Sequence, residues 1–296
     1  MSNDPWVYLN GKIMPLSRAS ISPLDRGFLY GDGLFETLRT SGGRPHRLLE
    51  HLARLRRAGV TIALDAALDE AEIETAVADL RRRNSLDEMY VRITLTRGLH
   101  RGSLDLVSDG RTVLIFVKPL ELPSESVYRE GVSLMLSRAC GACADFGHRP
   151  LPVKSLSYLT NLLALADARK RGFYEVLFTS ERGEVLEAAT ANVFFVQDAR
   201  LFTPSLDSGV LPGITRHAVI HLARANRIPV VERPIFPSLL AGCDEAFLTN
   251  SIVGVLPVRS IDGITLVPRL RDDDGLTAWI RRMYDQDVQA NVPACG

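Results

Sequence analysis

The sequence predicts a two-domain protein of the α+β or α/β class. Its 296 residues suit two modest domains, and an apolar content of 46% is ordinary for a globular protein with a substantial core. Short apolar or alternating runs typical of strands are interspersed with longer segments of helical periodicity. A polar stretch around Pro123 interrupts this pattern. We therefore expect a smaller N-terminal α/β domain over residues 1–122, a linker over 123–130 and a larger C-terminal domain over 131–296.

The balance of charge argues against a nucleic-acid or membrane partner. Lys and Arg together number 35, as do Asp and Glu, so the chain has no positive excess with which to bind nucleic-acid phosphates. No apolar run reaches the length of a membrane-spanning helix. The first residues, Met1 to Pro5, lack the basic and apolar regions of a secretion signal. We expect a cytoplasmic protein that acts on a small molecule.

Four cysteines give little support to a metal or redox site. Cys140 and Cys143 form a single C-x-x-C pair, while Cys243 and Cys295 stand alone. A structural zinc site needs a second pair, and a thioredoxin-like motif needs a βαβ context that this segment lacks. We expect a plain loop at Cys140 and Cys143 and no metal site, with reactive thiols beside an active site as the alternative.

The N-terminal half is expected to combine strands with two amphipathic helices. Apolar residues at helical spacing indicate the helices, and alternation indicates the strands. A turn at Asn10-Gly11 joins the first two strands. The glycines at 27, 31 and 33 match no phosphate-loop fingerprint and are expected to allow tight turns in a loop. The expected helices are 46–58 and 69–83, and the expected strands lie within 7–13, 34–39, 89–97 and 112–118.

Three features of the C-terminal half carry chemistry. Lys154 precedes an apolar helical pattern that runs to about Gly172, in a region where basic residues are otherwise mostly arginine. Glu187 ends a short strand, and Gly213 with the two residues after it opens a further helix. The expected strands are 132–137, 175–179, 193–196, 200–203, 228–232 and 245–249, and the expected helices include 215–226, a short one from Pro237 and 276–284.

Together these features point to pyridoxal phosphate (PLP). Free backbone N–H groups at the start of the Gly213 helix form an anion site suited to a phosphate. Glu187 supplies a carboxylate at some distance from it. Lys154 supplies an amine that can lose its proton and form a Schiff base, which arginine cannot. A surface lysine at a helix start is the alternative for Lys154 taken alone, but a carboxylate, a phosphate site and a lysine are the set that PLP requires.

Ordered motifs along nearly the whole chain carry a family resemblance. They are Asp25–Glu36, Glu50–Leu55, Val153–Ala164, Glu187–Phe194, Leu211–Arg216 and Thr249–Ser251. With these motifs the chain resembles the fold-type IV PLP enzymes, which include branched-chain aminotransferases, D-amino-acid aminotransferases and 4-amino-4-deoxychorismate lyases. The resemblance implies PLP as the cofactor and the two-domain fold of the D-amino-acid aminotransferase-like enzymes.

The resemblance also assigns cofactor-binding roles to individual residues. Lys154 would be the catalytic lysine, and Glu187 would stabilise a protonated pyridine nitrogen. Arg54 would bind the phosphate, although taken alone it is typical of an exposed helix partner of Glu50. Tyr158, four residues after Lys154 and expected on the same helical face, is a candidate for the ring hydroxyl, with a core or surface tyrosine as the alternative. The further cofactor-binding residues implied are Asn192, Ile214, Thr215 and Ser251.

Substrate-binding candidates come from the N-terminal half. Arg92 lies on the polar face of the strand 89–97, where it lines a cleft or faces water. In relatives an arginine of the following loop reaches a substrate carboxylate, often in the partner subunit's site, and Arg101 is the candidate here unless it is an ordinary exposed loop residue. Tyr30 and Phe35 are further candidates. Because relatives complete their sites across a two-fold axis, we expect a homodimer.

Two reaction classes remain open from the motifs. The lyases, which serve folate biosynthesis, are most similar in 27–33, 203–209 and 249–251. Branched-chain enzymes typically show a Gly-Thr-rich stretch where Asn250-Ser251 stands, and D-amino-acid enzymes often carry a histidine after the loop arginine, where this chain has Gly102. We favour a lyase that gives 4-aminobenzoate and pyruvate over an aminotransferase that uses 2-oxoglutarate or pyruvate as acceptor. An inactive PLP-binding scaffold is least favoured, because the lysine and the phosphate-binding groups are present.

Overall fold

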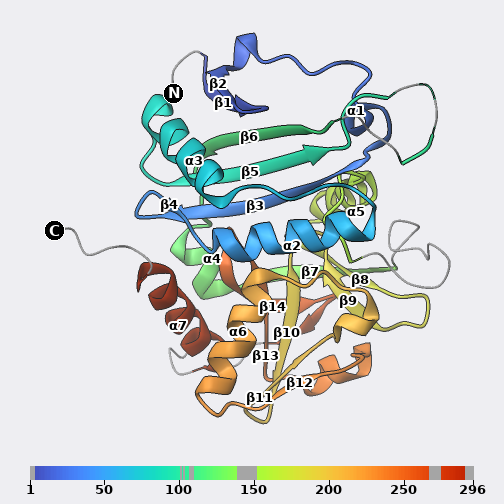
Figure 1. The fold of residues 1–296 in the computed structure, drawn as a ribbon. Helices are drawn as coiled ribbons and strands as arrows, with labels where there is room; N and C mark the ends of the chain where they lie inside the picture. The colour runs from blue at the N-terminus through green and yellow to red at the C-terminus, as the bar shows by residue number, and fades with distance from the viewer. Residues whose placement is uncertain are drawn as a thin grey trace. The chain divides into compact units, whose positions relative to one another are not determined.

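The chain folds into two compact units, which Figure 1 shows as a ribbon. This computed structural model describes residues 4–100, 102, 104–106, 110–138, 152–266 and 275–290. The first unit comprises Met1–Glu121, Val153–Ser157 and Val288–Gly296. The second unit comprises Leu122–Pro152 and Tyr158–Asp287.

Three features of this division differ from the domains expected from the sequence, and one of them is that Val288–Gly296 belongs to the first unit. The segment Val153–Ser157, with Lys154, belongs to the first unit because its backbone pairs with strand β3 (Gly33–Ser41). The expected linker over 123–130 contains helix α4 (Glu125–Glu130). The charged residues of this short helix, Glu125, Arg129 and Glu130, are exposed, whereas its Tyr128 is buried.

The first unit is built on an antiparallel sheet in the order β2-β1-β6-β5-β3-β4. Strand β5 alternates as its sequence predicts, because Val91, Ile93 and Leu95 are fully buried and the intervening side chains are partly exposed. The remaining strands are β1 (Trp6–Leu9), β2 (Lys12–Pro15), β4 (Arg44–Pro45), β5 (Met89–Thr96) and β6 (Thr112–Pro119).

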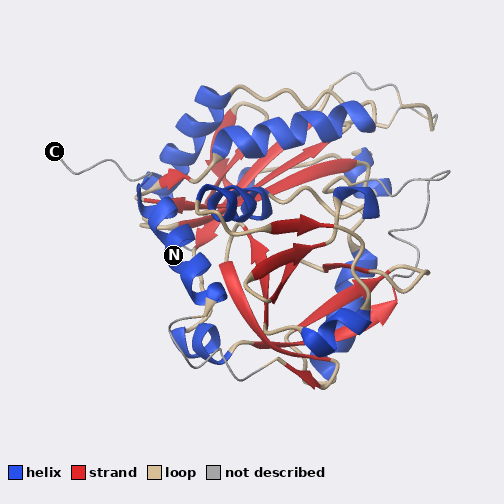
Figure 2. Ribbon diagram, turned by 90° about the horizontal axis from the view of Figure 1, so that it is seen from below, coloured by secondary structure: helices blue, strands red, loops and turns tan. Residues whose placement is uncertain are grey.

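Two amphipathic helices, α2 (Leu48–Thr61) and α3 (Glu70–Asn84), lie along one face of this sheet (Figures 1 and 2). The side chain of Asp69 accepts a hydrogen bond from the Glu72 N–H and so caps the start of α3. The apolar stripes of both helices and the inward residues of the strands form one core. Both helices therefore confirm the predicted periodicity, with ends that differ by one to three residues.

A short helix replaces part of the loop expected before β3. Helix α1 (Arg26–Tyr30) is capped by Asp25, whose side chain accepts from the Gly27 N–H. It ends at Gly31, whose φ of +67° is the left-handed conformation that glycine adopts without strain. Five residues are too few to show helical periodicity, so no pattern in the sequence predicts this helix. A single 3₁₀ turn, Leu16–Arg18, lies earlier in this unit.

The second unit contains a larger mixed sheet in the order β12-β11-β10-β13-β14-β7-β8-β9, with β15 paired to β14. Strand β7 runs parallel to β8 and β14, and β11 runs parallel to β12, whereas the other pairs are antiparallel. The strands are β7 (Val132–Arg138), β8 (Glu175–Thr179), β9 (Val185–Ala188), β10 (Asn192–Gln197), β11 (Arg200–Thr203), β12 (Val230–Glu232), β13 (Glu245–Asn250), β14 (Gly254–Ile261) and β15 (Ile264–Thr265).

The helices of the second unit begin close to their predicted positions, but the last one extends six residues beyond the expected 276–284, and its final residues, from Val288, belong to the first unit. They are α5 (Leu159–Lys170), α6 (Ile214–Ala225) and α7 (Leu276–Ala290), in addition to α4. The short helix expected from Pro237 is a 3₁₀ helix, Pro237–Gly242, and another covers Leu206–Ser208. Strands β10 and β13 are central to the core, where the rings of Phe194 and Phe247 stack with centroids 5.0 Å apart.

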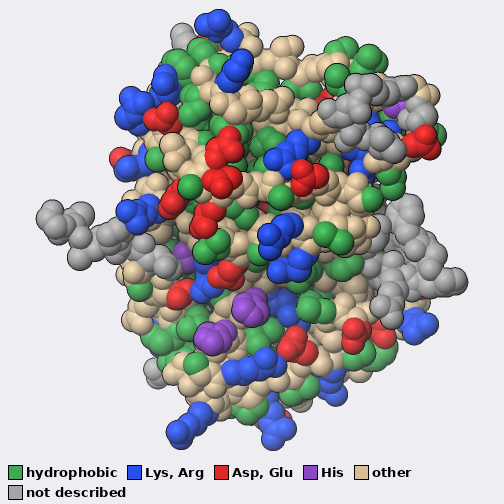
Figure 3. Space-filling view, in the orientation of Figure 1, with side chains coloured by type: hydrophobic (Ala, Val, Ile, Leu, Met, Phe, Trp, Pro, Cys, Tyr) green, Lys and Arg blue, Asp and Glu red, His purple; other side chains and the backbone are tan. Residues whose placement is uncertain are grey.

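Exposed charges of both signs are interspersed on the face shown in Figure 3. Within the described residues, no helix combines the length and apolarity that crossing a membrane requires. The same part of the chain contains no group of three or more His, Cys, Asp or Glu side chains placed to hold a metal ion.

Candidate cofactor and substrate site

The predicted site residues are distributed over both units. The first unit holds Tyr30, Phe35, Arg54, Arg92 and Lys154. The second unit holds Tyr158, Glu187, Asn192, Ile214, Thr215 and Ser251. Arg101, Cys140 and Cys143 lie outside the described residues.

Backbone pairing with β3 holds Lys154 in place. The Lys154 carbonyl accepts from the Phe35 N–H at 2.9 Å, and the Leu156 N–H donates to the Gly33 carbonyl at 3.0 Å. A Cβ at Gly33 would lie 2.7 Å from Leu156 Cδ1 and 2.4 Å from the Leu95 carbonyl oxygen, so only glycine permits this approach. The segment around Lys154 is thus extended and not helical, which corrects the expected shared helical face with Tyr158.

The Phe35 ring contacts two cationic side chains. Lys154 Nζ lies 4.5 Å from the ring centroid, and the Arg92 guanidinium carbon lies 3.8 Å from it. Phe35 is buried on β3, and Arg92 comes from the neighbouring strand β5. Such contacts are attractive because the ring face carries partial negative charge. The Phe35 ring is therefore a shared contact of the predicted amine and of one predicted substrate-binding arginine.

Arg54 is buried on α2 and forms a two-point ion pair with Glu36 of β3. Its Nε donates to Glu36 Oε1 at 2.8 Å, and its Nη2 donates to Glu36 Oε2 at 2.6 Å. His51, one turn earlier on α2, places Nδ1 2.7 Å from Glu36 Oε2. Glu50 pairs with Arg47, and Arg54 is buried, so the alternative of an exposed helix arginine considered from the sequence is wrong.

The buried ion pair sets the charge of Glu36. Burial alone raises the pKa of this carboxyl, but the Arg54 guanidinium and then His51 outweigh burial and lower the pKa to about 2. Glu36 and His51 were missed in the sequence, although a lone carboxylate in the apolar strand 34–39 was the available signal. The pair fixes the direction of the Arg54 side chain, since a buried two-point contact leaves a planar guanidinium little freedom.

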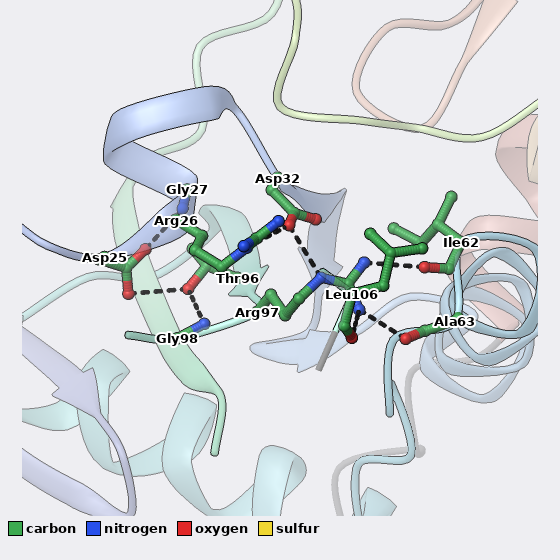
Figure 4. A network of polar contacts seen from close by, with 10 residues as sticks. All are labelled: Asp25, Arg26, Gly27, Asp32, Ile62, Ala63, Thr96, Arg97, Gly98 and Leu106. Atoms are coloured by element: carbon green, nitrogen blue, oxygen red, sulfur yellow. Dashed lines mark hydrogen bonds and ion pairs between the residues drawn. The ribbon is translucent and has the colours of Figure 1, made fainter. Parts of the chain in front are cut away.

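A second polar network surrounds Arg97, which sequence reasoning also missed (Figure 4). Arg97 is 1% exposed, and its Nε donates to Asp32 at 2.8 Å. Asp32 also accepts from Arg26 of α1 at 2.8 Å. The Nη atoms of Arg97 donate to three carbonyl groups, those of Ile62, Ala63 and Leu106. One buried arginine thus ties α1, the end of α2 and the segment after β5 together.

Tyr30, a predicted substrate-binding residue, lies at the end of α1 beside this network. It is 48% exposed, and its ring meets the His100 ring edge-on, with centroids 5.5 Å apart. The Arg26 guanidinium carbon lies 5.6 Å from the Tyr30 ring centroid. The His100 N–H donates to the Leu24 carbonyl at 2.8 Å, so α1 and the described start of the loop after β5 lie side by side.

In the second unit, Asn192 and the Leu211 backbone orient the carboxylate of Glu187. Asn192 Nδ2 donates to Glu187 Oε2 at 2.8 Å, and the Leu211 N–H lies 3.0 and 3.1 Å from the two carboxylate oxygens. Asn192 Nδ2 also donates to the Leu211 carbonyl at 2.9 Å. Glu187 lies on β9, as expected, and Asn192 begins β10. The carboxylate therefore has a fixed orientation.

The same asparagine contacts the start of α6. Gly213 is the N-cap of α6, and no side chain caps its first turn. A Cβ at Gly213 would lie 2.0 Å from Asn192 Oδ1, so this close packing requires glycine. Asn192 consequently fixes the carboxylate of Glu187 relative to the N–H groups of Ile214 and Thr215.

Hydroxyl groups add to the anion-binding character of this helix start. Thr215 is 1% exposed and its Oγ1 lies 3.3 Å from the Tyr284 hydroxyl. Thr249, the strand partner of Asn192, projects from the same face of the sheet. Within the described residues, Thr249 Oγ1 is buried and has no hydrogen-bond partner. A buried hydroxyl without a partner beside an uncapped helix start fits an anion such as the PLP phosphate.

Ser251 and Tyr158 lie in ordered local settings. Ser251 follows β13 in a turn where Asn250 Oδ1 accepts from the Ile252 and Val253 N–H groups, both at 2.9 Å. The Tyr158 hydroxyl donates to the Ala189 carbonyl, next to the strand that carries Glu187. The predicted site residues of the two units together include the chemical groups that PLP needs: an amine, a carboxylate, helix N–H groups and hydroxyls.

The chain belongs to the family described as amino-transferase class IV, whose profile matches residues 33–261. It is therefore a PLP-dependent enzyme of class IV. The family membership confirms the predicted cofactor and the predicted fold-type IV architecture.

Relatives with different reactions align over almost the whole chain. A putative branched-chain-amino-acid aminotransferase of Methanocaldococcus jannaschii is 32% identical, with 95% of this chain and 99% of that protein covered. The aminodeoxychorismate lyase of Bacillus subtilis is 31% identical, with 96% and 94% covered. The D-alanine aminotransferase of Bacillus licheniformis is 28% identical, with 88% and 89% covered.

Solved structures agree in fold. A branched-chain aminotransferase from Thermoproteus uzoniensis, determined with norvaline, superposes with a TM-score of 0.86 at 29% identity and covers 98% of this chain and 96% of its own. The branched-chain amino acid aminotransferase of Escherichia coli gives a TM-score of 0.86 at 26% identity and covers 97% and 95%.

We predict that Glu36→Gln lowers the free energy of unfolding by about 3 kcal/mol at pH 7, because buried Arg54 loses its counter-charge. The pKa of Glu36 falls from an ordinary 4.5 to about 2 on folding, so its contribution is complete above pH 4.5 and is lost as pH falls toward 2. Urea unfolding of both proteins from pH 7 downward should show the difference shrinking below pH 4.5.

Glu74→Gln, an exposed position on α3, is the matched control and should change the unfolding free energy little. A loss for Glu36→Gln that equals the loss for Glu74→Gln, or that is the same at every pH, would contradict the charge assignment.

Proposed function

We propose that this class IV enzyme is a 4-amino-4-deoxychorismate lyase that releases 4-aminobenzoate and pyruvate. The observation that carries the proposal is that one ring, that of Phe35, contacts both the Arg92 guanidinium and the amine of Lys154. A substrate with ring and enolpyruvyl carboxylates needs a cation next to the reacting amine. The 31% identity with the Bacillus subtilis lyase and the similarity of motifs 27–33, 203–209 and 249–251 support the same reaction.

Transamination is the second candidate, with a branched-chain or D-amino acid as donor and 2-oxoglutarate or pyruvate as acceptor. The specific support is the 32% identity with the Methanocaldococcus jannaschii protein and the TM-score of 0.86 with the Thermoproteus uzoniensis enzyme. Both reactions need the same lysine, carboxylate and phosphate-binding groups, so the proposed roles below hold for either.

Lys154 is the proposed catalytic residue. When bound, PLP withdraws electrons from the carbon that carries the substrate amine. Lys154 Nζ would hold the cofactor in the resting enzyme, and the same amine would accept the proton from the substrate carbon. Its place beside Phe35, on a backbone segment paired with β3, limits its motion to the side chain. In transamination the same nitrogen would deliver the proton to the cofactor.

The remaining proposed roles follow from donor and acceptor types. Glu187, held by Asn192 and the Leu211 N–H, stabilises a proton on the pyridine nitrogen. Arg54 supplies a fixed positive charge for the phosphate. Neutral donors for the phosphate are the Ile214 N–H, the Thr215 hydroxyl and the Ser251 hydroxyl. Tyr158 is proposed to contact the ring hydroxyl of the cofactor, and Tyr30 is proposed to contact the substrate. Arg101 is proposed as a second cation for the substrate.

We predict that aminodeoxychorismate yields 4-aminobenzoate and pyruvate faster than any amino acid yields glutamate from 2-oxoglutarate. Chromatography of products with both substrate classes measures this. Arg92→Ala should lower kcat/KM for the dicarboxylate by about tenfold or more, the scale of a lost charge-assisted contact, and should affect a neutral arylalkylamine much less. Lys154→Ala should abolish every reaction.

Arg57→Ala, an exposed position on α2, is the matched arginine control and should leave both substrates unchanged. Robust glutamate formation with no 4-aminobenzoate would assign the protein to the aminotransferases. Turnover at the wild-type rate in Lys154→Ala would refute the proposed catalytic lysine.

We also propose that the enzyme is a homodimer. Apolar side chains of the first unit are exposed on α1 and on the described part of the segment after β5, and the bridge between Asp25 and Leu99 makes these two parts neighbours. Exposed apolar side chains on neighbouring segments are typical of a protein–protein interface, and a second copy of the chain is the proposed occupant. The exposed residues are Leu24, Phe28, Leu29, Tyr30, Leu99, Leu104 and Leu106.

We predict a sedimentation mass of twice the 32.6 kDa chain mass at assay concentrations. Phe28→Glu should shift the protein toward monomer, because Phe28 is 75% exposed among these apolar side chains. Val60→Glu, at a 79% exposed position on α2, is the matched control and should leave the mass unchanged. A fully active wild-type monomer would contradict the proposal.

A further inference from the structure

The C-terminal helix α7 buries one tyrosine near the start of α6. Its apolar stripe consists of positions three or four residues apart, among them Ile280, Tyr284 and Val288. Tyr284 is 1% exposed and is among the largest fully buried side chains. No part of the proposed function uses this residue.

Tyr284 touches both elements that carry the proposed hydroxyl donors for the phosphate. Its hydroxyl lies 3.3 Å from Thr215 Oγ1 in the first turn of α6. Its ring covers Gly254 at the end of the turn that contains Ser251, where an added Cβ would lie 3.0 Å from Tyr284 Cε1. Gly254 has a φ of +70°, so glycine is required there both by the backbone and by the ring.

The start of α7 is fixed by a buried carboxylate. Glu245 is 3% exposed on β13, and its two oxygens accept from the Leu276 and Thr277 N–H groups at 3.0 and 2.7 Å. A carboxylate at a helix start is stabilised by the helix dipole and by these charge-assisted bonds. Strand β13 therefore holds the start of α7 through its first residue, Glu245, and leads into Ser251 at its other end.

The middle of α7 contacts helix α4, and α4 in turn contacts the turn that contains Ser251. The Arg281 guanidinium carbon lies 4.0 Å from the Tyr128 ring centroid, and Arg281 also pairs with Glu125. The Tyr128 hydroxyl donates to the Val253 carbonyl at 2.9 Å. The turn after β13 is thus supported from two sides, by Tyr128 through a hydrogen bond and by Tyr284 through packing.

The hydrogen-bond chemistry of Thr215 gives the Tyr284 hydroxyl a direction. A threonine hydroxyl has one proton to donate and two lone pairs. If Thr215 donates its proton to a phosphate, Thr215 Oγ1 is the acceptor for Tyr284. The tyrosine then holds the threonine in the rotamer and hydrogen orientation that the anion requires.

We propose that Tyr284 is a positioning residue for the phosphate of PLP, acting through the Thr215 hydroxyl and the turn that contains Ser251. The inference rests on the proposed phosphate-binding role of Thr215. Tyr284 itself touches neither substrate nor the reacting atoms. It makes the C-terminal helix a structural part of cofactor binding.

The test compares PLP with pyridoxal, which lacks the phosphate but forms the same link to lysine. Full-length wild type and Tyr284→Phe are dialysed to equilibrium against each compound, and bound cofactor is measured by absorbance. The variant keeps the ring packing on Gly254 and loses one hydrogen bond. PLP should bind about fivefold more weakly, the scale of one net hydrogen bond, while pyridoxal binding stays the same.

Two further variants make each outcome decisive. Tyr174→Phe makes the same chemical change elsewhere in the second unit and should alter neither affinity. Thr215→Val should weaken PLP binding by itself. In that background, Tyr284→Phe should cause no additional loss of PLP affinity, because the threonine hydroxyl that the tyrosine orients is already absent.

Equal weakening of PLP and pyridoxal by Tyr284→Phe would show a general structural role and overturn the proposal. Unchanged PLP affinity in Tyr284→Phe, with weakened affinity in Thr215→Val, would overturn it and leave the role of Thr215 intact. Unchanged affinity in Thr215→Val would remove the proposed phosphate role of Thr215, and the positioning role of Tyr284 with it.

Discussion

The hydrogen bonds between β3 and the segment Val153–Ser157 are the constraint on which the proposed chemistry of the first unit depends. They bring Lys154, far along the chain, onto a strand that also carries Phe35 and Glu36. Phe35 contacts the lysine and Arg92, while Glu36 fixes Arg54. The approach requires glycine at position 33, since any side chain there would collide with Leu156. One strand thus sets the position of the amine and of two arginines.

In the second unit, Asn192 has the corresponding role. Its side chain bonds to the Glu187 carboxylate and to the Leu211 carbonyl, and it packs against the Cα of Gly213. A rigid carboxylate and a rigid helix start are useful only if their separation is fixed, because PLP is itself a rigid ring with its nitrogen and phosphate at set positions. Tyr284 extends this rigidity from the helix start to the turn after β13.

Local patterns in the sequence are sufficient to predict most helices and strands. Alternation in β5 and helical spacing in α3 are properties of neighbouring residues, so the sequence predicts them directly. Helix α1 was missed because five residues show no period. The contact between Glu36 and Arg54 joins residues 18 positions apart, and the contact between Thr215 and Tyr284 joins residues 69 positions apart. Patterns among neighbouring residues cannot predict such contacts. The helical face assigned to Lys154 and Tyr158 was wrong because pairing with β3 keeps the lysine segment extended.

The central claim is that Lys154 carries the cofactor, and direct chemical labelling tests it. Borohydride reduction of the PLP-loaded protein, followed by peptide mapping, converts the link between lysine and PLP into a stable label. We expect a single labelled peptide that contains Lys154. A label on Lys118 or Lys170 in place of Lys154 would contradict the claim, since neither lies on the segment that pairs with β3.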